Sequence, residues 1–164
     1  MIETIKPSGR FYLEHWRGNK LLSKNLIDNL VTTQGKNAML NIMFGGGTQI
    51  LTWYAGLISN TGFTTVAVTD THASHAGWVE FVAYNEANRI EWAEDAAAAG
   101  SMTNTTLMVF TINAIGSVRG LFLSNENVKG DTSAETLWCA TELASAQTVI
   151  VADVLRLTYT PTLT

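Results

Sequence analysis

Residues 116–160 decide the fold, because they contain three apolar runs: GSVRGLFLSN (116–125), ETLWCATEL (135–143) and TVIVADVLRLTYT (148–160). Each run is rich in β-branched or aromatic residues and ends at Asn, Gly, Asp or an Ala-Ser-Ala segment, which is typical of consecutive antiparallel strands. We therefore expect three neighbouring strands in one sheet. The third run is too continuously apolar for strict alternation. It is expected to be covered on both faces, or bulged near Ala152 and Asp153, and to lie centrally.

Further strands are predicted before this core. Residues 9–17 and 20–31 form a hairpin around the turn Gly18-Asn19. Apolar runs at 51–59, 78–84 and 107–115 predict the other strands.

One helix is predicted. It begins near Thr33, with Thr32 or Thr33 as its cap, and ends at glycines 45–47. About ten short strands and one helix predict a mainly β fold. We expect a single-domain antiparallel β-sandwich, jelly-roll-like, with one short amphipathic helix lying on a sheet. The sandwich spans residues 9–164, and residues 1–8 form a flexible or partner-bound arm.

The composition limits the classes of partner. Charged residues make up 15% of the 164 residues, against about 25% in typical domains, and the mean hydropathy is +0.12. We therefore expect a partner to cover part of the surface, including further copies in a homodimer or homotrimer. The net charge of −4 and the scattered basic residues argue against direct nucleic-acid binding. Neither a membrane span nor a signal peptide is predicted, so the chain should stay in the cytoplasm unless it is carried out inside an assembly.

Three residues form a candidate metal cluster. Asp70, His72 and His75 could bind zinc if their loop made one helical turn. The alternative is that they hold a long loop through hydrogen bonds. We favour this alternative, because a metal site needs a further ligand and supporting partners that the sequence does not show.

Other candidate chemistry is no stronger. Adjacent Glu94 and Asp95 are expected at a solvated corner, since acid–base catalysis needs carboxylates that face each other across a cleft. The sequence around Lys36 does not match the motif of a phosphate-binding loop, because Leu30 stands where the first glycine of that motif should be. Cys139 is predicted to be a small buried hydrophobic residue. No catalytic, cofactor-binding or metal-binding residue is assigned, and we expect a protein that is not an enzyme and has no cofactor.

Five segments carry a further signal: NLIDNLVTTQGKNAML (25–40), WYAGLI (53–58), DTHASHAGWVEFVAY (70–84), FTINAIGSVRGLFLS (110–124) and VADVLRLTYTPTLT (151–164). In order and spacing they resemble a family of small structural proteins encoded in the virion gene clusters of tailed bacteriophages. That family shows segments such as N-L-x-x-x-x-G-K, W-Y-x-G-L and H-A-G-W-x-E-F-x-x-Y. The last segment departs from the family pattern, because it lacks the glycine before Asp153.

The resemblance implies a structural role in a virion. We expect a capsid decoration, or cement, protein that binds the major capsid protein on the outside of the shell and stabilises it. The chain has neither the repeats nor the coiled-coil heptads of long fibres. The alternative is a tail or fibre module that binds a receptor, with Trp16, Trp53 or Trp92 stacked on sugars. Either protein would be made in the host cytoplasm and end in the virion, the decoration protein on the capsid surface.

Overall fold

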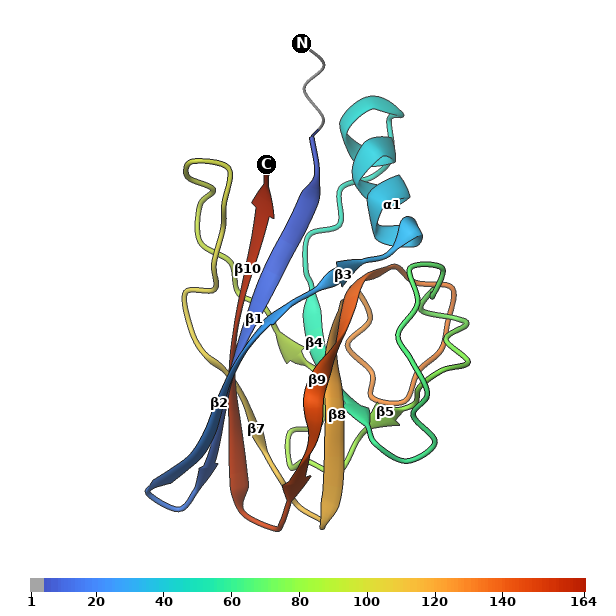
Figure 1. The fold of residues 1–164 in the computed structure, drawn as a ribbon. Coiled ribbons are helices and arrows are strands. Elements are labelled where there is room, and N and C mark those ends of the chain that lie inside the picture. Colours follow the sequence, from blue (N-terminus) through green and yellow to red (C-terminus); the bar gives the residue numbers. More distant parts are fainter. Residues whose placement is uncertain (1–4) are drawn as a thin grey trace.

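The computed structural model describes residues 5–164, which form one antiparallel β-sandwich with one helix (Figure 1). The smaller sheet has the order β2-β1-β10-β7, and the larger has β3-β9-β8-β4-β5, with β6 also paired to β4. This confirms the predicted mainly β sandwich. The elements are β1 (Pro7–Arg17), β2 (Lys20–Asp28), β3 (Leu30–Val31), α1 (Thr33–Phe44), β4 (Tyr54–Ser59), β5 (Glu80–Phe81), β6 (Ile90–Glu91), β7 (Met108–Thr111), β8 (Gly116–Ser124), β9 (Leu137–Val149) and β10 (Asp153–Leu163).

The amino-terminal hairpin forms as predicted. Buried and outward residues alternate along β1, and Gly18 in the turn to β2 has a φ of 55°. The predicted return strand, however, divides after Asp28: β2 stays in the smaller sheet, whereas β3 pairs with β9 in the larger one. Pro7 already pairs with Leu163, so the end of the predicted arm 1–8 belongs to the sandwich. Residues 1–4 of that arm lie outside the described residues.

The three runs that predicted one sheet are divided between the two sheets. β8 and β9 pair as predicted, but β10 lies in the smaller sheet, between β1 and β7. β9 continues through the predicted turn to Val149, and the chain reverses at residues 150–152, where Ala152 has a φ of 69°. An alanine gives no sequence signal for a left-handed turn, which explains the misplaced turn. β10 is central as predicted. Its buried and half-exposed residues alternate, so only one of its faces is covered.

The chain between β4 and β7 is largely irregular. The strand predicted at 51–59 begins only at Tyr54, although it is buried as expected. The strand predicted at 78–84 is reduced to β5. Trp78, before β5, donates a hydrogen bond from its side chain to Asp70. Tyr84, after β5, makes only an isolated β-bridge to Ile112. Long loops therefore lie beside the larger sheet and bring together residues that are distant in sequence.

The core fills the space between the two sheets. Its largest side chains are at most 1% exposed and include Tyr84, Tyr159, Phe11, Phe110, Leu13 and Leu121. The hydroxyl of Tyr159 accepts hydrogen bonds from Trp138 Nε1 at 2.7 Å and Asn29 Nδ2 at 2.8 Å. The polar end of this buried ring is therefore satisfied, as a buried hydroxyl requires. Among the described residues, no helix is both long and apolar enough to cross a membrane.

Helix α1 begins and ends where the sequence predicts. Thr32 is its cap and accepts a hydrogen bond from the amide of Gly35 at 2.9 Å, and the amide of Gly45 bonds to Asn41 O at 2.9 Å. Only Gly35 of the helix is buried. The exposed fractions of Met43 and Phe44 are 60% and 79%. The predicted apolar face thus exists, but the sheet covers little of it.

Replacing Gly35 with alanine should displace the helix. A Cβ atom there would lie 2.5 Å from the carbonyl oxygen of Trp138, so backbone would have to move. We expect a loss of about 1–3 kcal/mol in the free energy of unfolding, measured by urea denaturation. Exposed Asn37→Ala in the same helix is the control. A Gly35→Ala variant as stable as this control would contradict the close contact between α1 and β9.

Candidate functional site

The candidate metal cluster of Asp70, His72 and His75 does not form. Asp70 accepts from Trp78 Nε1 and from the amide of Ala67, both at 2.9 Å. His75 stacks on Trp78, with ring centroids 3.8 Å apart, and His72 turns toward Arg89 instead. Among residues 5–164, no group of three His, Cys, Asp or Glu side chains is placed to hold a metal ion. The three residues hold their loops through hydrogen bonds, as the favoured interpretation predicts.

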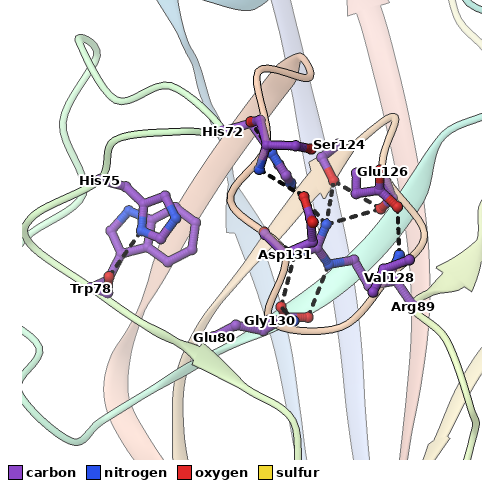
Figure 2. A network of polar contacts seen from close by, with 11 residues as sticks. His72, His75, Trp78, Glu80, Arg89, Ser124, Glu126, Val128, Gly130 and Asp131 are labelled. Carbon is purple, nitrogen blue, oxygen red and sulfur yellow. Dashed lines mark hydrogen bonds and ion pairs between the residues drawn. The ribbon is translucent and has the colours of Figure 1, made fainter.

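Arg89 is the centre of a buried polar network (Figure 2). Its guanidinium donates to both carboxylate oxygens of Glu80, at 3.0 and 2.8 Å, and only 2% and 5% of the two side chains are exposed. It also donates to the carbonyls of Glu126 at 3.0 Å and Asp131 at 3.1 Å. A buried charge pair with this many partners is strongly held. The network thereby attaches the loop between β8 and β9 to β5.

His72 completes this network as a neutral side chain. Arg89 Nη1 lies 2.9 Å from His72 Nε2, and a guanidinium can only donate. His72 Nε2 therefore accepts, and Nδ1 carries the hydrogen that bonds to Ser133 O at 2.9 Å. Every group in the network faces a protein partner rather than a cavity. We interpret it as a structural support for the loop, not as a reactive site.

The other candidate residues also have structural roles. Glu94 and Asp95 are exposed at a corner, as predicted. Cys139 is fully buried, and its burial raises the pKa of the thiol to about 12. The thiol is therefore protonated at neutral pH and behaves as the predicted small hydrophobic residue.

The strongest candidate for a binding site is an apolar groove beside α1, with a volume of about 360 Å³. Its lining includes three tryptophans and three methionines, namely Trp53, Trp92, Trp138, Met39, Met43 and Met102. None of its lining residues is charged. The groove lies at the end of the sandwich where α1, the start of β1 and the end of β10 come together (Figure 1). Sequence reasoning missed it, because its walls come from distant segments.

More exposed apolar side chains adjoin the groove. Phe44 follows the lining residue Met43 and is 79% exposed, and Leu51 follows the lining residue Ile50 and is 74% exposed. Leu163, which lines the groove itself, is 46% exposed. Exposed apolar side chains gathered near an apolar groove are typical of interaction sites on soluble domains. We refer to the groove and these neighbours as the helical end.

The three tryptophans proposed to stack on sugars occupy different places. Trp92 is only 5% exposed and donates to Tyr159 O at 3.2 Å, so it cannot present a face to a sugar. Trp53 is half-buried and lines the groove. Trp16 is half-buried on the outer side of β1, far along that strand from the helical end. Among the alternatives Trp16, Trp53 and Trp92, stacking on sugars is therefore wrong for Trp92.

The chain matches no model of a known protein family and no curated protein at a significant level. Its resemblance to phage virion proteins therefore stays a prediction. The function has to be argued from the surfaces of this chain itself.

Proposed function

We propose that the protein is a non-enzymatic structural subunit of a phage virion, a decoration protein that binds the outside of the capsid. The observation that carries this proposal is the helical end, an uncharged apolar groove with exposed apolar side chains at or next in sequence to its lining residues. The resemblance of five segments to virion proteins agrees with it. So does the nature of the polar network, whose groups support a loop rather than face a substrate.

The helical end is the surface that we assign to the shell. Because no charged residue lines the groove, the partner with matching chemistry is an uncharged apolar segment of the major capsid protein. The methionines in its wall can adapt to such a segment. Specific interfaces of ordinary size bury about 1,600 Å², and repetition over a symmetric shell would strengthen modest contacts. A subunit that bridges neighbouring capsid proteins would resist the outward stress from packaged DNA.

Virions that lack the protein should release their DNA at a lower temperature than complete virions. Burial of a large apolar side chain contributes about 1.5–3 kcal/mol, so Phe44→Ser should weaken binding to empty shells at least tenfold. Ile115→Ser is the matched control: Ile115 is 76% exposed, but it adjoins the opposite end of β9, where Gly116 pairs with Val149. Shells that melt at the same temperature without the protein would refute the proposal, as would its location in the tail by cryo-electron microscopy.

Self-association in a homodimer or homotrimer belongs to the same proposal. The edge strand β2 presents Leu22 and Leu26 outward, with exposed fractions of 40% and 65%, and an open edge of this kind can pair with another chain. A tail or fibre module that binds a receptor is the second candidate. The outer face of the smaller sheet favours it.

A further inference from the structure

The outer face of the smaller sheet has a shallow hollow of about 480 Å³ over β1, β2 and β10. Its position follows from strand register. Arg10 on β1 lies between Asp28 on β2 and Thr160 on β10, and the next outward residue, Tyr12, lies between Leu26 and Thr158. Ser8 and Thr162 form a third pair at one end of the hollow. Hydroxyl, carboxylate and guanidinium groups, together with the exposed side chain of Leu26, thus surround one aromatic ring.

The charges of this face are nearly balanced, because three cations, Arg10, Lys24 and Arg156, lie beside two carboxylates, Asp28 and Glu14. Arg10 Nε donates to Asp28 Oδ1 at 2.6 Å, and Lys24 Nζ lies 3.9 Å from Glu14 Oε1. A highly charged ligand would therefore find little net attraction here. Hydroxyls and paired charges offer both donors and acceptors to a ligand that is rich in hydroxyl groups.

The aromatic side chains of this face are held in place. Tyr12 Oη donates to one carboxylate oxygen of Glu14 at 3.0 Å, and Trp16 Nε1 donates to the other at 2.8 Å. The hydrogen bonds from Trp16 and Tyr12 hold the pKa of Glu14 below its ordinary value, so the acceptor stays ionised at neutral pH. Four residues along a strand separate the two Cα atoms by about 13 Å, and the shared Glu14 carboxylate brings the two rings closer together than that. Rings that are already fixed lose little conformational entropy when a ligand stacks on them.

We propose that this face binds a neutral oligosaccharide, with the apolar side of one sugar ring on Tyr12 and sugar hydroxyls bonded to Asp28, Arg10 and the threonines. Trp16, whose ring already has the Arg156 guanidinium 4.9 Å from its centroid, would contact the same chain further along β1 with its remaining exposed surface. Sugars combine an apolar ring face with many hydroxyls, which is the combination that this surface matches. A lipid fits poorly, because a pair of charges and several hydroxyl groups line the hollow. A nucleic acid fits poorly, because two of the three cations, Arg10 and Lys24, are paired with carboxylates.

Calorimetric titration of the purified full chain tests this inference without any virion, so its result is independent of the proposed function. The probes are hexasaccharides of glucose, N-acetylglucosamine, mannose and galactose. We expect at least one to bind, and Tyr12→Ala or Asp28→Ala to weaken binding at least about tenfold. Tyr12→Phe keeps the ring and should bind within about threefold of the original chain. Tyr54→Ala, on the other sheet, is the matched control.

Three results would overturn the inference. The first is no binding of any probe at about 10 mM sugar. The second is binding that Tyr12→Ala and Asp28→Ala leave unchanged while both variants keep their thermal unfolding transition. The third is tighter binding of an acidic hexasaccharide, hexagalacturonate, than of every neutral one, which would contradict the nearly balanced charges.

Discussion

Replacing Asp153 with asparagine should lower the free energy of unfolding by about 3–5 kcal/mol, because it removes the charge of a buried carboxylate that several donors hold. The Asp153 side chain is fully buried. It accepts hydrogen bonds from Arg17 Nε at 2.8 Å and Nη2 at 2.9 Å, from His15 Nε2 at 2.8 Å, and from the amide of Ile150 at 2.9 Å. In asparagine an NH₂ group replaces one of these carboxylate oxygens, and its N–H donors would face the N–H donors that the carboxylate now accepts from. The turn between β9 and β10 would then lose its anchor.

Urea denaturation measures this loss, and Asp28→Asn is the matched control. Asp28 also pairs with an arginine, but 77% of its side chain is exposed, and exposed pairs contribute only about 0–1 kcal/mol. If the two substitutions have equal effects, the buried carboxylate does not stabilise the fold in the way its contacts indicate.

The same carboxylate should make the stability depend on pH. The hydrogen bonds from Arg17, and then those from Ile150 and His15, hold the pKa of Asp153 well below its ordinary value. The unfolded chain therefore takes up a proton at a pH where the folded protein keeps the carboxylate ionised. Stabilisation is complete above about pH 4, the ordinary pKa of aspartate, and is lost as the pH falls through the folded-state pKa. The difference between the original chain and Asp153→Asn should shrink in acid.

The features that the sequence predicted correctly are local. The cap at Thr32, the glycine end of α1 and the Gly18 turn each depend on a few adjacent residues. The sheet that receives β10 could not be predicted in this way. That choice depends on pairing with β1, whose residues lie more than 130 positions away along the chain. The turn at Ala152 also lacks a glycine or asparagine that would have marked it.

The candidate site was missed for the same reason. The groove takes its walls from α1, from residues 97–102 and from the end of β10, which no local pattern connects. The buried network did leave one signal in the sequence. Glu80 stands inside the apolar run 78–84, and a carboxylate in a buried run needs a cation. That reasoning could have predicted a partner for Glu80, although it could not have chosen Arg89 from among the basic residues.

Replacing Arg89 with methionine should be as damaging as the change at Asp153. It would leave Glu80 buried without its cation, and the carbonyls of Glu126 and Asp131 without their donor. We expect a loss of about 3–5 kcal/mol. Arg89→Lys should recover little of it, since one ammonium group cannot reproduce the paired contact with both Glu80 oxygens. Exposed Arg10→Met is the control.

A double-mutant cycle with Glu80→Met separates the charge pair from the support of the loop. Removing both charges abolishes the uncompensated carboxylate, so the double variant should be more stable than Arg89→Met alone. It should not regain full stability, because the two loop carbonyls still lack their donor. Hydrogen exchange reports on the loop directly: the amide of Gly130, which donates to Glu80 Oε2 at 2.6 Å, should lose its protection in every variant of the pair. Protection of that amide that survives in Arg89→Met and in the double variant would show that the loop is held by other contacts, and that the network does not have the supporting role that its geometry assigns.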